Sequence, residues 1–185
     1  MNRDDIVRFF AALDEGLTEP SVLYVYGSAV IILLGSPFRT SLDIDVAGPY
    51  SSVDEAALAR AGEKAGLPVN PDSDYLGNHI EWVGPLRLCL PLPDDDGLTL
   101  WQGKRLVVKS ANIPALVASK LIRYDETDRG DVQFLYSQFP FDWESVCRAA
   151  KKLPPPFAGD ILVRDNLEAL ANDLQLWRGT LEERQ

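Results

Sequence analysis

The chain has 185 residues, of which 46% are hydrophobic and 25% are charged, and its formal net charge is −10 at pH 7. This composition is typical of a globular protein, and the length predicts one domain with at most a small helical appendix. The acidic balance argues against a broad nucleic-acid-binding surface. Because no apolar run reaches transmembrane length, we expect no membrane partner.

Two features of the sequence bear on the cellular compartment. The first residues, Met1 to Asp5, lack the basic start and apolar core of a signal peptide. The two cysteines, Cys89 and Cys147, lie far apart in the sequence, which favours reduced thiols over a disulfide framework. We therefore expect a cytoplasmic protein.

The first half of the chain predicts one helix followed by a strand-rich region. Apolar residues recur at helical spacing over residues 3–15, which predicts an amphipathic helix. Further helices are expected over 28–35 and 53–65, and strands over 22–26, 42–47, 80–83, 86–90, 98–101 and 105–108. The segment 91–97 combines Pro, Asp and Gly and predicts a turn-rich loop.

Beyond Pro114 the pattern changes to helices. They are expected over 113–125, 129–138, 142–152 and 160–178. The run Pro154-Pro155-Pro156 separates the last two as a stiff spacer. A strand-rich half followed by a helical half favours an α/β (α+β) architecture.

The most informative motif is Asp43-Ile44-Asp45. Two carboxylates at alternate positions of a strand point to the same face, where they can hold a hard divalent cation. Leu42, Ile44 and Val46 are apolar, which predicts one wet face and one buried face. An exposed strand with a polar outer face would show the same alternation, so the motif alone leaves both interpretations open.

The pair Gly27-Ser28 follows a predicted strand and opens a predicted helix. A small residue at a helix start lets backbone N–H groups approach a phosphate. The same pair can also be an ordinary strand-to-helix junction with Ser28 as the helix N-cap. A strand, a Gly-Ser pair, a helix and a strand with Asp-x-Asp, in that order, therefore suit the binding of a nucleoside triphosphate with its metal ion.

These residues resemble the nucleotidyltransferase superfamily. The matching segments are Tyr26-Gly27-Ser28-Ala29 and Arg39-Thr40-Ser41-Leu42-Asp43-Ile44-Asp45-Val46. The Arg-Thr pair before the acids resembles the toxin-type branch, which comprises AbiEii/AbiGii toxins and uncharacterised relatives. A second block agrees, in Ala118-Ser119-Lys120-Leu121-Ile122-Arg123 and Asp128-Arg129-Gly130-Asp131-Val132.

The resemblance implies a small mixed β-sheet flanked by helices. Residues 1–111 would form the nucleotidyltransferase core, and residues 112–185 a helical region that completes the cleft. The implied enzyme is a metal-dependent transferase that moves an NMP from an NTP to an acceptor hydroxyl. The acceptor would be a tRNA end or a protein side chain, within a toxin–antitoxin or phage-defence pair that includes a cognate partner protein.

The resemblance also implies roles for individual residues. Mg²⁺ or Mn²⁺ would be held by two strand acids and a third carboxylate, which can also serve as the base: Asp43, Asp45 and Glu81. The NTP would be held by Gly27, Ser28, Arg39, Thr40 and Lys120. Asp131 matches a downstream acid of the branch and is expected to pair with Lys120 and orient it.

Each assignment has a structural alternative. Glu81 can be an outward-facing strand residue, Lys120 a surface lysine, and Asp131 an acid near a helix N-terminus, while Arg39 and Thr40 can be loop residues. The single histidine, His79, leaves little room for a Ser-His-Asp triad or a His-rich zinc site.

Two alternative functions also remain at this point. The chain can be an inactive nucleotidyltransferase-fold module that acts as an antitoxin or partner protein. It can also be an acidic scaffold, which nucleotide affinity would exclude.

Overall fold

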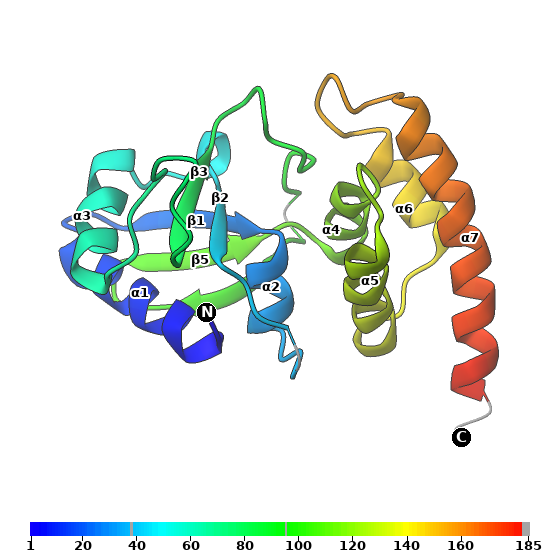
Figure 1. The fold of residues 1–185 in the computed structure, drawn as a ribbon, viewed down its shortest axis with the longest axis horizontal. Helices are drawn as coiled ribbons and strands as arrows, with labels where there is room; N and C mark the ends of the chain where they lie inside the picture. The colour runs from blue at the N-terminus through cyan, green and yellow to red at the C-terminus, as the bar shows by residue number, and fades with distance from the viewer. Residues whose placement is uncertain (38, 95, 183–185) are drawn as a thin grey trace. The chain divides into compact units, whose positions relative to one another are not determined.

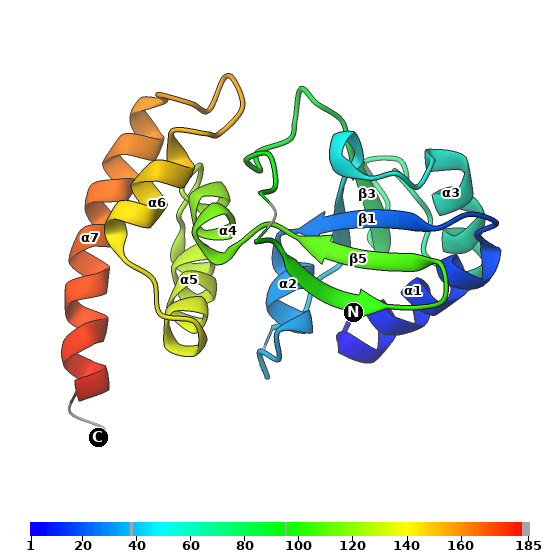
Figure 2. The ribbon, with the colours of Figure 1, turned by 180° about the vertical axis from the view of Figure 1, so that it is seen from behind.

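The computed structural model describes residues 1–37, 39–94 and 96–182, and the chain divides into two compact units (Figures 1 and 2). The N-terminal unit comprises Met1–Leu88 and Pro93–Ala111, and the helical unit comprises Cys89–Leu92 and the chain from Asn112 onward. Asp95, in the expected 91–97 loop, lies outside the described residues. Among the helices that the structure describes, none has the length and apolar character needed to cross a bilayer.

A five-stranded mixed sheet forms the centre of the N-terminal unit (Figure 1). Its order is β3-β2-β1-β5-β4. β1 runs antiparallel to β2 and parallel to β5, β2 runs parallel to β3, and β4 runs antiparallel to β5. The strands are β1 Ser21–Tyr26, β2 Asp43–Ala47, β3 His79–Val83, β4 Leu98–Gln102 and β5 Leu106–Ser110. The α/β (α+β) class with a small mixed sheet is confirmed.

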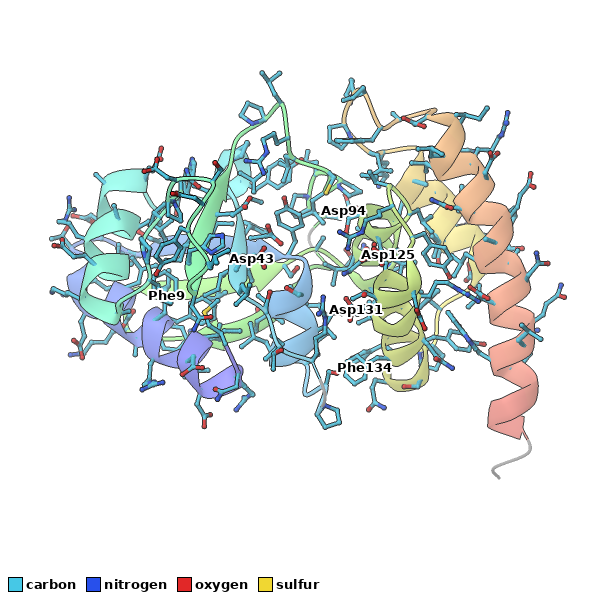
Figure 3. All side chains as sticks on the ribbon, in the orientation of Figure 1. Phe9, Asp43, Asp94, Asp125, Asp131 and Phe134 are labelled. Atoms are coloured by element: carbon cyan, nitrogen blue, oxygen red, sulfur yellow. The ribbon has the colours of Figure 1, made fainter. Side chains whose placement is uncertain are left out.

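Three helices accompany this sheet: α1 Arg3–Gly16, α2 Ser28–Leu33 and α3 Glu55–Ala65, with a 3₁₀ turn at Gly48–Tyr50. α1 begins at a capping box, in which the Asn2 side chain accepts from the Asp5 N–H and the Asp5 side chain accepts from the Asn2 N–H. Its apolar face packs against α3 and β5. Phe9, labelled in Figure 3, is fully buried there, and Phe10 meets the Trp101 ring at 5.9 Å.

The alternation of buried residues defines the two faces of the sheet. Leu23, Val25, Ile44, Val46 and Ile80 have no exposed surface, and burying each such side chain stabilises the fold by about 1.5–3 kcal/mol. Several of their strand neighbours, namely Val22, Tyr24, Asp43, Asp45, His79 and Glu81, are half-buried, whereas Tyr26 and Ala47 at the strand ends are buried. The sheet therefore has one core face and one partly open face.

Two expectations about strands are wrong. Residues 86–90 form a turn and loop, because the N–H groups of Arg87 and Leu88 both donate to the Gly84 carbonyl at 3.1 Å. Leu86 is accordingly 89% exposed. Leu42 precedes β2 and is also exposed, so the buried face of that strand begins at Ile44.

The helical unit contains α4 Ile113–Lys120, α5 Glu126–Gln138, α6 Trp143–Ala150 and α7 Ile161–Glu182. α4 contacts α5 and α6, and α6 contacts α7. The expected 113–125 helix is shorter, because Tyr124 adopts a positive φ of 53° and the Asp125 side chain caps α5. The chain thus turns between Lys120 and Glu126, and α5 begins three residues earlier than expected.

Candidate functional site

The two strand acids lie on one face of the sheet. Asp43 and Asp45 alternate with Ile44 and Val46, which are fully buried on the other face. Both acids are half-buried, and Figure 3 labels Asp43 on β2. The backbone pleat therefore presents two carboxylates side by side on the partly open face.

The parallel pairing of β2 with β3 brings two more polar side chains to this face. Asp43 is in register with His79, and Asp45 is in register with Glu81. Ligand atoms of Asp43, His79 and Glu81 all lie within 4.8 Å of one another. Asp45 is not a member of that group among the described residues. The predicted carboxylate on a neighbouring strand, Glu81, is thus beside the acid pair, together with a histidine that was not predicted to take part.

Gly27 lies directly against Asp45. The β1–β2 register pairs Tyr26 with Asp45, so the residue after β1 reaches the acid. Gly27 has φ +68° and ψ −148°, a combination that side chains with a Cβ rarely adopt. A Cβ added there would lie 2.2 Å from Asp45 Oδ2. Both the backbone conformation and the close approach of the carboxylate therefore require glycine.

Ser28 is joined to Asp43 through a residue that sequence reasoning missed. The Ser41 hydroxyl donates to Asp43 Oδ1 at 2.6 Å. Ser28 Oγ lies 2.6 Å from Ser41 Oγ, and because the Ser41 proton goes to Asp43, Ser28 is the donor of that bond. Ser28 is not the helix N-cap, since Gly27 occupies that position without a side-chain cap. A hydroxyl two residues before an Asp is a local pairing signal that could have pointed to Ser41.

Glu81 and His79 have further partners. Arg87 Nη2 donates to Glu81 Oε2 at 3.0 Å. His79 Nε2 lies 3.8 Å from Glu81 Oε1, and His79 Nδ1 lies 3.0 Å from the Gly77 carbonyl oxygen. A carbonyl only accepts, so Nδ1 carries a proton, and in the neutral ring Nε2 is the nitrogen that can bind a cation.

The arginine–threonine pair forms a local contact. Arg39 Nη1 donates to the Thr40 carbonyl at 3.2 Å. The Arg39 side chain is half-buried and Thr40 is exposed. The nucleotide role expected for these two residues stays a prediction.

Lys120 and Asp131 belong to the helical unit, where they form an ion pair. Lys120 Nζ lies 2.6 Å from Asp131 Oδ2 and 2.9 Å from Asp128 Oδ1. The side chains are nearly buried, at 11% exposure for Lys120, 3% for Asp128 and 5% for Asp131. Arg123 also donates to both oxygens of Asp128, at 2.9 and 3.1 Å, and this carboxylate raises the pKa of the guanidinium.

Arg129, two residues from Asp131, has a different partner. It makes a two-pronged contact with the buried Asp173 of α7, at 2.9 Å from Nε and 2.5 Å from Nη2. The Tyr124 hydroxyl donates to the same carboxylate at 2.8 Å. Burial, followed by the Asp173 hydrogen bond, raises the pKa of Tyr124 far above its usual range. Arg129 therefore ties α5 to α7, while Asp131 pairs with Lys120 at the end of α4.

Comparison with known proteins finds no relative. No family model matches the chain, and neither a curated protein nor a solved structure is significantly similar to it.

Proposed function

We propose that this chain is a metal-dependent nucleotidyltransferase that moves an NMP from an NTP to an acceptor hydroxyl. The observation that supports it most is the contact between the Gly27 turn and Asp45 on the face that also carries Asp43. Such a turn lets phosphate oxygens approach the backbone next to carboxylates that bind their counter-cation. The toxin-type motif order in the sequence favours the same activity.

The donor set fits a divalent cation. Asp43 and Glu81 offer carboxylate oxygens within 4.8 Å of each other, and Asp45, in register with Glu81 but outside that group, would join them by rotation of its side chain. Hard cations such as Mg²⁺ or Mn²⁺ prefer oxygen ligands. When bound, the cation would neutralise charge on the entering and leaving oxygens of the transfer. The Ser41 hydroxyl donates to Asp43 Oδ1 and so restricts the rotation of that carboxylate.

The chain's own residues would position the reactants. Gly27, without a Cβ, lets the Asp45 carboxylate lie against the backbone of the turn, where the triphosphate would approach. The acceptor oxygen would form a bond to the α-phosphorus as the bond to the bridging oxygen of the β-phosphate breaks and pyrophosphate leaves. Glu81 is in register with Asp45 and would accept the proton of the acceptor hydroxyl. The acceptor class, an RNA end or a protein side chain, and a toxin–antitoxin or defence setting are suggested by the sequence resemblance.

The direct test is label transfer. The protein is incubated with each of the four NTPs labelled at the α-phosphate, with Mg²⁺ or Mn²⁺, and with total tRNA or cell lysate. We expect label on RNA or on protein, and its loss in an Asp43→Asn plus Asp45→Asn variant. Asp72→Asn plus Asp74→Asn is the matched control, because it also removes two negative charges, from exposed side chains of the same unit.

A binding measurement separates a transferase from an inactive module. An NTP present at 100 times its Kd, with its cation, should add about 2.7 kcal/mol to the free energy of unfolding and raise the melting temperature. A shift that depends on both acids, without label transfer, would favour the binding module. No shift with any NTP and no label would overturn the proposal.

A further inference from the structure

We propose that His79, Asp43 and Glu81 form a three-ligand site for a transition-metal dication such as Zn²⁺ or Co²⁺. This inference goes beyond the proposed transfer reaction, because an ion can bind these side chains whether or not the protein uses NTP. It assigns a ligand role to the chain's single histidine.

The sheet register places the three side chains. Asp43 and His79 are directly paired on parallel strands, and Glu81 follows His79 on the same face. A tetrahedral ion with ligands at about 2.0–2.2 Å holds its ligand atoms roughly 3.3–3.6 Å apart. His79 Nε2 and Glu81 Oε1 are 3.8 Å apart, and the whole group lies within 4.8 Å. Side-chain rotations that close the group by about 1 Å would satisfy that geometry.

Each ligand is held through its other polar atom. His79 Nδ1 donates to the Gly77 carbonyl, Asp43 Oδ1 accepts from Ser41, and Glu81 Oε2 accepts from Arg87. Metal-binding sites use this outer ring of hydrogen bonds to fix the tautomer and direction of their ligands. His79 Nε2 and Glu81 Oε1 lie 3.8 Å apart, and Asp43 offers a carboxylate oxygen to the same group within 4.8 Å.

Packing restricts the imidazole further. The Tyr75 ring meets the His79 ring edge-on, at 6.1 Å between centroids and 88° between planes. The side chain of His79 is 17% exposed and that of Glu81 is 29% exposed. An ion can therefore reach the group from solvent while its ligands stay largely ordered.

The donor chemistry determines which ion is favoured. One imidazole with two carboxylates suits Zn²⁺ and Co²⁺, whereas Mg²⁺ prefers an all-oxygen octahedron with several waters. Removing the imidazole should therefore weaken binding of the transition metals far more than binding of Mg²⁺. This difference between the two losses of affinity distinguishes a His79 that binds the metal from a His79 that only supports the local structure.

The test uses the full chain after chelator treatment, without nucleotide. Titration with Co²⁺ is followed by its visible absorption, and Zn²⁺ and Mg²⁺ affinities are measured by calorimetry. We expect His79→Ala and Glu81→Gln each to weaken Zn²⁺ and Co²⁺ binding at least about tenfold, with Asp74→Asn close to wild type. In His79→Ala, the Mg²⁺ affinity should change much less than the Zn²⁺ affinity. Metal-free melting curves of the variants verify their folding.

Two outcomes would overturn the inference. One is wild-type affinity for Zn²⁺ and Co²⁺ in His79→Ala, and the other is an equal loss of Zn²⁺ and Mg²⁺ binding. Label transfer from NTP without a Co²⁺ spectrum would reject this site and leave the transferase standing. A Co²⁺ spectrum that depends on His79, without label transfer, would support the site and count against the transferase.

Discussion

Replacing Gly27 with alanine tests the contact on which the proposed nucleotide site depends. Gly27 has φ +68° and ψ −148°, and a residue with a Cβ in such a sparsely populated region costs about 1–3 kcal/mol. The new methyl carbon would also lie 2.2 Å from Asp45 Oδ2, so the carboxylate must move. For a chain of this length, the strain alone should lower Tm by roughly 2–12 °C, at about 2–4 °C per kcal/mol.

Gly66→Ala is the control for alanine at a positive φ without a close neighbour. Gly66 has nearly the same φ, +70°, but its ψ of 26° places it in the left-handed helical region, and no atom lies within 4 Å of its added Cβ. Its cost should be about 1–2 kcal/mol, without any displacement of Asp45. Gly27→Ala should therefore lose more stability than Gly66→Ala, and it alone should lose the melting shift produced by NTP and Mg²⁺.

Urea unfolding and thermal melting with and without ligand measure both effects. Equal destabilisation by the two substitutions, together with an unchanged ligand response in Gly27→Ala, would refute the reasoning. It would mean that the carboxylate relaxes away at no cost, and that the close approach of Asp45 has no function.

Two further predictions concern carboxylates with several donors. Burial works to raise the pKa of Asp14, but N–H donors of residues 104–106 outweigh it and lower the pKa. Asp14→Asn should therefore lower the free energy of unfolding by about 1–3 kcal/mol at pH 7. Because the pKa of Asp14 is lower in the folded state than in the unfolded state, the difference in stability between wild type and variant should shrink as the pH falls below about 4. Urea unfolding at a series of pH values measures that difference. Lys120→Met leaves Asp128 and Asp131 without their shared ammonium, so urea unfolding should show a loss of about 3–5 kcal/mol. Restoration of much of that loss by adding Asp131→Asn would support the pairing, whereas a loss under 1 kcal/mol in Lys120→Met alone would contradict it.

Local patterns in the sequence determined which side chains share a face. Alternation places Asp43 and Asp45 opposite the buried Ile44 and Val46, because successive strand residues point to opposite sides. Helical spacing likewise marked the apolar face of α1. The strand expected over 86–90 failed because the turn at Gly84 redirects the backbone hydrogen bonds, which an apolar run does not reveal.

Only the tertiary structure decided which distant residues meet. The pairing of Asp43 with His79 and of Asp45 with Glu81 depends on the register of two strands separated by more than thirty residues. A shift of one residue would turn His79 and Glu81 to the core face, and no local pattern sets that register. The sequence suggested that Lys120 pairs with Asp131, but the turn between α4 and α5 also brings Asp128 to the same ammonium. Residue types and local periodicity thus belong to the sequence, whereas convergence of side chains arises from long-range packing and backbone pairing.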